Sequence, residues 1–165
     1  MNPQVARHLA PALLLLAACQ QPAAAPQVTA AQFTAEDEAT LRALFDSAAS
    51  EISSKRWDEW GMHYSEDAVL YPPNEAARTG QPAIVAWGRT LPVESVSFPD
   101  PRVEGEGNFA WGTSGYVLKL IGRPADTGKQ VVIWRRSAEG RWEVRAVSFN
   151  SNLPAAAVEK VPVRN

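Results

Sequence analysis

The sequence predicts an α+β domain in which about three N-terminal helices pack on a strongly curved antiparallel sheet of four to six strands. Two patterns support this fold class. Apolar residues recur at helical spacing in the first half of the folded segment, whereas short β-type segments separated by turn residues fill the second half. Gly112 and Gly115 interrupt the longest of these segments, which indicates a bulge or a strong bend. A curved sheet folded over helices forms a cone with one open end, and such a cone can hold a small molecule.

The first helix is predicted over residues 35–54. Thr34 stands three residues before Asp37, which is the spacing of a helix N-cap followed by an acid in the first turn. Beyond this cap, apolar residues recur at the spacing of a helix with one buried face. These residues are Leu41, Leu44, Phe45, Ala48 and Ile52.

The segment WDEWGMHYSEDAVLYPP, residues 57–73, combines aromatic, acidic and imidazole side chains, which is a composition typical of active sites. Its aromatic residues Trp57, Trp60 and Tyr64, however, share one face of a second helix predicted over residues 57–65. Aromatic residues with this spacing usually pack in a core, whereas the acids of the segment fall on other faces. We therefore interpret the segment as the wall of a cavity.

The remaining elements follow from apolar runs bounded by turn residues. A brief strand is expected at residues 68–71, where two prolines stop it, and a third helix is expected to begin near Pro82. Short turns between the later segments favour antiparallel pairing of successive strands. These strands are predicted over residues 93–98, 102–106, 109–121, 129–136 and 141–149.

Residues 1–19 have the features of a lipoprotein signal peptide. Arg7 is their only charged side chain, and their apolar run is too short to span a bilayer. The run ends in Leu16-Ala17-Ala18-Cys19, which resembles a bacterial lipobox. We therefore expect lipidation of Cys19 and a protein anchored to the membrane of the bacterial cell envelope, facing the periplasm or the cell surface. The alternative is an ordinary secretory peptide in which Cys19 has no role.

The chain that follows the signal peptide divides into three segments. Residues 20–33 carry no charge and contain two prolines and several alanines, so that we expect a flexible tether. Residues 34–154 form the predicted cone domain, and residues 155–165 form a C-terminal tail.

Composition excludes several classes of function. The 16 Lys and Arg residues are outnumbered by 18 Asp and Glu residues and are scattered, so that no basic surface for nucleic acid is expected. Cys19 is the only cysteine, which rules out a disulfide within the chain. His63 is the only histidine after the signal peptide, which rules out a metal site with several imidazole ligands. We expect neither a metal nor a cofactor.

Three phrases of the sequence, in this order, resemble a known superfamily. They are YSEDAVLYPPNEAARTGQPAIVAW, DTGKQVVIWRRSAEGRWEV and FNSNLP, and together with the first helix they cover about Glu36 to Pro154. Their order is similar to that of the SnoaL-like branch of the nuclear transport factor 2-like superfamily, whose members have a cystatin-like cone fold. That superfamily includes ketosteroid isomerase, polyketide cyclases, dehydratases and members without known activity, so the resemblance implies a fold and no particular reaction.

The resemblance does not extend to the catalytic residues of ketosteroid isomerase. In that enzyme a carboxylate ends the first short strand just before a proline, whereas this chain has Tyr71-Pro72-Pro73. The oxyanion-binding tyrosine of the isomerase belongs to its first helix, which contains no tyrosine here. Related uncharacterised members often carry an aspartate where this chain has Val147. Steroid isomerisation of that kind is therefore not expected.

Two residues are candidates for acid–base chemistry. His63 carries the side chain best suited to proton transfer near neutral pH; alternatively, it is a helix-flank residue beside Trp60 without a chemical role. Glu75 follows the two prolines, which could aim it over the cavity; alternatively, it lies in a solvated loop. The resemblance further implies five residues in the lining of a ligand pocket. These are Tyr64, Tyr71, Tyr116, Trp134 and Asn150.

These observations predict a membrane-anchored protein whose cone domain binds a small apolar or carbonyl-containing molecule. They leave open whether the protein is an enzyme. One alternative is a noncatalytic interaction module that forms a homodimer through the outer face of its sheet. Another is an isomerase, dehydratase or hydrolase that uses Glu75 or His63 as a base.

Overall fold

The computed structural model describes residues 32–153. The predicted signal peptide with Cys19, most of the tether and the C-terminal tail lie outside the described residues. Within the described range, none of the helices is long and apolar enough to cross a membrane. The helices are α1 (Ala35–Ser53), α2 (Trp57–Gly61) and α3 (Gln81–Thr90). The strands are β1 (Tyr64–Tyr71), β2 (Arg78–Thr79), β3 (Val93–Ser97), β4 (Arg102–Glu106), β5 (Phe109–Leu120), β6 (Asp126–Arg136) and β7 (Trp142–Ser151).

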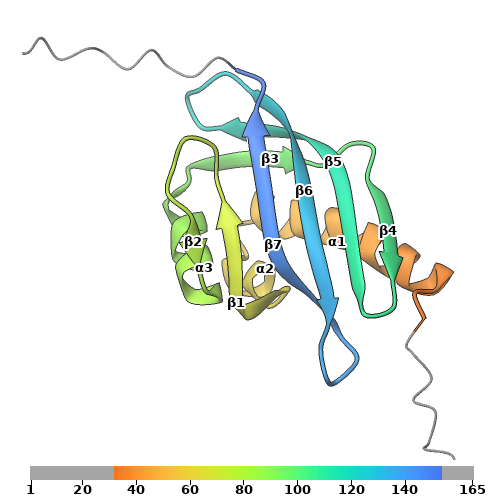
Figure 1. Ribbon diagram of the computed structural model, residues 1–165. Coiled ribbons are helices and arrows are strands. Elements are labelled where there is room, and N and C mark those ends of the chain that lie inside the picture. Colours follow the sequence, from red (N-terminus) through yellow and green to blue (C-terminus); the bar gives the residue numbers. More distant parts are fainter. Residues whose placement is uncertain (1–31, 154–165) are drawn as a thin grey trace, which may run out of the picture.

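The strands form one sheet in the order β2-β1-β7-β6-β5-β3, and β4 also pairs with β5. Strand β5 connects both β3 and β4 to the rest of the sheet. Its first half pairs with β4 and its second half pairs with β3. Figure 1 shows α1 behind the sheet, where it crosses the strands, and α2 and α3 near β1 and β2. The predicted α+β fold, with three helices packed on a strongly curved sheet, is confirmed.

Two features of the sheet differ from the sequence prediction. The described residues form seven strands rather than four to six, because β2 spans only two residues and is too short to show a periodic pattern. The sheet is mixed rather than antiparallel, because β1 runs parallel to β7. These two strands lie far apart in the chain, so no turn between them marks their pairing in the sequence.

The boundary between α2 and β1 also differs from the prediction. Helix α2 ends at Gly61 instead of residue 65, and β1 begins at Tyr64 instead of residue 68. The backbone N–H of Val144 donates to the carbonyl oxygen of His63 at 2.8 Å, which draws the chain into the sheet at this point. Pairing with β7 therefore outweighs the helical spacing of the aromatic residues.

The glycines of β5 do not produce a bulge against β6. The two strands pair without a register shift from Phe109 to Leu118, and this ladder starts β6 at Asp126, earlier than predicted. Gly112 instead makes room for the indole of Trp134, since a Cβ atom at this position would lie 2.6 Å from that ring. The register shifts lie elsewhere, between β6 and β7, between β1 and β7, and between β3 and the end of β5.

The hydrophobic core lies between the helices and the inner face of the sheet. Phe45 of α1 meets Trp134 of β6 edge to face, with ring centroids 5.7 Å apart. Four large apolar side chains from different parts of the chain are almost completely buried, so that the core joins helices and strands into one unit. They are Leu41, Leu70, Ile84 and Val93.

A polar cluster fastens the beginning of α1 to the end of the β6–β7 hairpin. Thr34 and Asp37 form the predicted cap as a reciprocal capping box. The carboxylate of Asp37 also accepts a hydrogen bond from Trp142 Nε1 at 2.9 Å and pairs with Arg136 at 2.7 Å. Phe33, the last residue of the predicted tether, packs edge to face on Trp142. Burial by itself raises the pKa of Asp37, but the hydrogen bonds from Trp142, Arg136 and Thr34 together lower this pKa well below its ordinary value.

We predict that Asp37→Asn lowers the free energy of unfolding at neutral pH by about 2 kcal/mol, because hydrogen bonds to a charged group contribute about 1.5 to 3 kcal/mol. The folded-state pKa of Asp37 lies below its unfolded value, so its contribution is present above about pH 4 and disappears as the pH falls further. Urea unfolding between about pH 5 and pH 2 should therefore show a weaker pH dependence in the variant than in the wild type.

The matched control is Glu36→Gln, which removes an exposed acid from the same helical turn. Glu36→Gln should change the free energy of unfolding little anywhere between about pH 5 and pH 2. Identical pH dependences of Asp37→Asn and the wild type would contradict the assigned role of Asp37.

Candidate functional site

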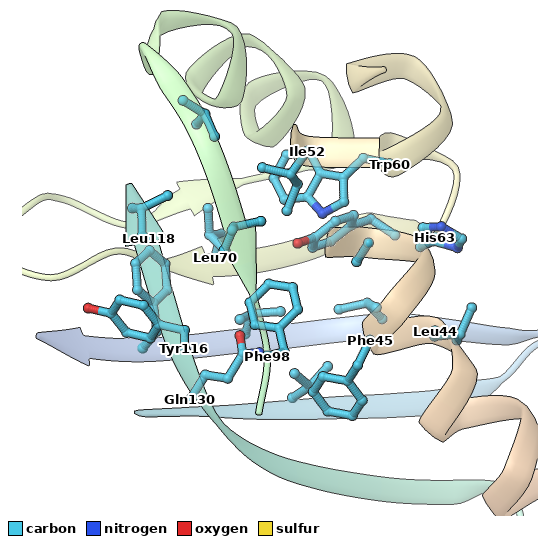
Figure 2. Close-up of a pocket in the computed structure, with 18 of the residues that line it drawn as sticks. Leu44, Phe45, Ile52, Trp60, His63, Leu70, Phe98, Tyr116, Leu118 and Gln130 are labelled. Atoms are coloured by element: carbon cyan, nitrogen blue, oxygen red, sulfur yellow. The ribbon is translucent and has the colours of Figure 1, made fainter. Parts of the chain in front are cut away.

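A cavity of about 120 Å³ lies between the helices and the inner face of the sheet. All three helices and the strands β1, β3, β5, β6 and β7 contribute to its wall. Figure 2 shows that apolar side chains from helices and strands surround it. Those labelled are Leu44, Phe45, Ile52, Leu70, Phe98 and Leu118. Most of the wall can therefore offer only apolar contact to an occupant.

At one end of the cavity, His63 lies between α2 and β1 and lines the wall (Figure 2). Its Nε2 atom lies 2.8 Å from Oε2 of Glu51, which belongs to the last turns of α1. Both side chains are largely shielded from solvent, with 24% of the His63 side chain and 11% of the Glu51 side chain exposed. The pair therefore connects α1 to the start of β1 at the edge of an apolar cavity.

Glu51 is a site residue that the sequence analysis did not identify. It lies three positions after Ala48, on the side of α1 that carries the apolar lining residues. An acid on the apolar side of an amphipathic helix requires a partner. The position of Glu51 on this side of the helix was the signal in the sequence, and His63 is the only histidine within residues 20–165 that could pair with it.

At the opposite end from His63, Tyr116 and Gln130 supply polar atoms (Figure 2). The hydroxyl of Tyr116 donates to Asp126 at 3.1 Å, and the same carboxylate accepts from Ser151 at 2.6 Å. Burial, together with the neighbouring Asp126 carboxylate, raises the pKa of Tyr116 to about 12. Gln130 donates to the hydroxyl of Ser114 at 2.9 Å. This end of the cavity therefore presents uncharged hydrogen-bonding groups.

Two further ring residues place potential donors in the wall. Tyr64 is buried, and this burial raises the pKa of its phenol far above the usual value, so that the hydroxyl stays protonated. Trp134 is also buried, and its Nε1 atom has no hydrogen-bond partner among residues 32–153. An unsatisfied buried donor is costly, which favours an occupant that carries a hydrogen-bond acceptor.

The structure brings together four of the residues that the sequence analysis selected. They are His63, Tyr64, Tyr116 and Trp134, all of which line the cavity.

Two of the expected pocket residues lie elsewhere. Tyr71 pairs with Ser148 on the outer face of the sheet and is 49% exposed. Asn150 is opposite Lys129 on the same outer face and is also exposed. Alternate residues of a strand point to opposite faces, and the register that decides which residues point inward was not visible in the sequence.

Glu75 lies outside the cavity as well. Its carboxylate accepts hydrogen bonds from Arg78 at 2.7 Å and from Trp87 Nε1 at 3.1 Å. Trp87 lines the cavity with its ring, so Glu75 holds a wall residue in place from the solvent side. The acid that the sequence analysis considered for catalysis thus occupies a supporting position, where it does not face an occupant of the cavity.

No cluster of three or more His, Cys, Asp or Glu side chains within residues 32–153 could hold a metal ion.

Neither a family model nor a curated protein matches this chain. Solved structures do match. An NTF2-like protein of unknown function from Pseudomonas putida aligns with a TM-score of 0.65 and 16% identity, over 76% of this chain and 92% of that one. An NTF2-like protein with a cystatin-like fold from Novosphingobium aromaticivorans aligns with a TM-score of 0.60 and 18% identity, over 71% and 82% of the two chains.

A ketosteroid isomerase-like protein from Erwinia carotovora atroseptica aligns with a TM-score of 0.59 and 18% identity, over 73% of this chain and all of that one. These likenesses establish that the chain has the cystatin-like cone fold of NTF2-like proteins, as the sequence resemblance implied. At this level of identity they establish the fold alone, and the function has to be inferred from the cavity.

We predict that Trp60→Ala lowers the free energy of unfolding by about 3 to 5 kcal/mol, the usual loss for a truncated core aromatic residue. Trp60 is 6% exposed and meets both Trp57 and Tyr64 edge to face. Asp58→Asn and Glu59→Gln remove exposed acids of the same helix and should change the stability by no more than about 0.5 kcal/mol. Thermal and urea unfolding of the three variants tests this contrast; a loss of ligand binding without loss of stability in either acid variant would indicate an active site there.

Proposed function

We propose that the cone domain binds a small, uncharged and largely apolar molecule that carries at least one hydrogen-bond acceptor. The observation that carries this proposal is the cavity itself, which combines an apolar wall with a few polar groups at its ends. An engineered apolar cavity of about 150 Å³ in another protein holds benzene. A cavity of 120 Å³ is therefore suited to a ligand built around a single ring.

The charge of the ligand follows from the charged groups next to the cavity. Glu51 is paired with His63, and Asp126 accepts hydrogen bonds from Tyr116 and Ser151. An ionic ligand would lose its hydration in this apolar space without gaining an unpaired counter-ion. Aromatic residues such as Trp60 instead provide edge and face contacts for a flat ring.

We predict that 2-indanone, a ketone with one aromatic ring, binds to the domain and changes its tryptophan fluorescence. Four tryptophans, Trp57, Trp60, Trp87 and Trp134, line the cavity and would report its occupation. Ala48→Phe should abolish the change, because Ala48 lines the cavity from α1 and a phenyl ring there fills the space. The matched control is Ala43→Phe on the exposed side of the same helix, which should bind as the wild type does. Equal binding by Ala48→Phe would place the ligand outside the cavity.

As a second proposal, the outer face of the sheet packs against a second copy of the chain. The strand register aligns Trp111, Ile133, Ala146 and Val69 in one apolar row across four strands. Trp111 is 37% exposed, although large apolar side chains are usually covered. The next row of the same face contains both Arg135 and Glu143, so that a two-fold related copy can present an opposite charge to each.

We predict that residues 33–165 form a dimer in light scattering at tens of micromolar, a concentration at which even a micromolar dissociation constant gives a visible population. Trp111→Lys should shift the protein to a monomer with unchanged thermal stability, because it replaces the largest exposed ring of the apolar row by a charge. The control is Arg123→Glu. Arg123 lies in the β5–β6 loop, away from the apolar row, and the protein with this substitution should remain dimeric. A wild-type protein that is monomeric at this concentration would refute the proposal.

A further inference from the structure

His63 has the geometry of an oriented base. Its Nε2 atom lies 2.8 Å from a carboxylate oxygen of Glu51, and a carboxylate can only accept a hydrogen bond. In the neutral ring, Nε2 therefore carries the hydrogen atom and Nδ1 carries a free lone pair. The ring lines the cavity (Figure 2), and Nδ1 is the nitrogen that Glu51 leaves available.

The pair is also suited to hold a proton once it has been taken up. Protonation of Nδ1 produces an imidazolium ion, whose positive charge the adjacent Glu51 carboxylate stabilises. With 24% of its side chain exposed, His63 can exchange that proton with solvent, while Glu51 stays largely shielded. An apolar environment around the pair strengthens this interaction.

The other residues of the wall narrow the possible chemistry. Among the described residues 32–153, no serine, cysteine or lysine lines the wall, so that this part of the chain places none of the usual nucleophiles for covalent catalysis in the cavity. An imidazole can remove a proton from carbon only where the resulting charge is delocalised, as it is next to a carbonyl group. The phenol of Tyr64, kept protonated by burial, is a donor that such a carbonyl oxygen could use.

We propose that His63, oriented by Glu51, transfers protons to and from the carbon atom next to the carbonyl group of a bound ketone or ester. This inference rests on the proposed function, because it requires a ligand in the cavity. Nδ1 of His63 takes the proton, the electron pair of the C–H bond forms the C=C bond of an enolate, and the carbonyl π electrons move to oxygen. Return of a proton from Nδ1 to the same or a conjugated carbon atom restores the carbonyl compound. Glu51 is a positioning residue that acts through His63.

The alternative role of the pair is purely structural, as a link between α1 and β1. Two substitutions separate these roles. His63→Gln keeps a side-chain N–H that can donate to Glu51 but has no basic nitrogen. Glu51→Gln keeps an oxygen that accepts from the imidazole but removes the negative charge that stabilises its protonated form.

The experiment measures proton exchange at carbon with 2-indanone as the probe. The wild-type domain is incubated with 2-indanone in D₂O, and ¹H NMR follows the replacement of the hydrogens next to the carbonyl group by deuterium. Fluorescence binding of 2-indanone and thermal unfolding are recorded for the same samples. Wild-type protein should accelerate the exchange above the buffer rate by about 100-fold or more, the usual range for general acid–base catalysis.

In His63→Gln the exchange should fall to the buffer rate although the variant remains folded and still binds 2-indanone. Glu51→Gln should bind equally well and exchange more slowly than the wild type. Free imidazole should restore part of the exchange in His63→Ala, which a merely structural role would not produce. Asp58→Asn changes an exposed acid of α2 and should exchange at the wild-type rate.

Two results would overturn the inference: wild-type protein that binds 2-indanone without accelerating exchange, or His63→Gln that exchanges at the wild-type rate. Absence of binding by the wild-type protein would instead contradict the proposed function. Because binding and exchange are measured separately, the two failures can be told apart.

Discussion

The cavity depends on the parallel pairing of β1 with β7. This pairing joins the chain segment that leaves the helices to the last strand of the sheet, and the hydrogen bond from Val144 to the carbonyl oxygen of His63 marks its start. A register shift between Tyr64 and Val69 then separates two short paired stretches. As a result, His63 and Tyr64 are held against the sheet at the edge of the cavity, within reach of α1. If strands paired only with their neighbours along the chain, the segment around His63 and Tyr64 would have no contact that fixes it against β7.

Helix α1 is held by polar contacts near both of its ends, while its middle is apolar. At its beginning, Asp37 binds Arg136 and Trp142 of the β6–β7 hairpin. Near its end, Glu51 binds His63. Between these two contacts, Leu44, Ala48 and other apolar residues face the cavity. Directional polar contacts at the ends can keep the helix at a set distance from the sheet, whereas apolar packing alone would favour closure of the space between them.

Most elements could be predicted because their signals are local. The cap at Thr34 and the apolar repeat placed α1 within one residue of its observed end, and turn residues placed β4 at its observed bounds. The misplaced start of β1 has a different cause. Trp57, Trp60 and Tyr64 have the spacing of a helix, but the aromatic contact between Trp60 and Tyr64, with centroids 5.1 Å apart, forms across the end of α2. A pairing partner that lies far along the chain overrode the local preference.

The sequence by itself determined the class of fold and the presence of a single histidine within residues 20–165. These properties depend on apolar periodicity and residue counts, which are local or compositional. Only the tertiary structure decided which residues meet. It placed Glu51 against His63, turned Tyr71 and Asn150 to the outer face, and tied Glu75 to Trp87. Strand register and the position of a helix over a sheet arise from contacts between distant segments, and a one-residue change in register moves a side chain from the cavity to the outer face.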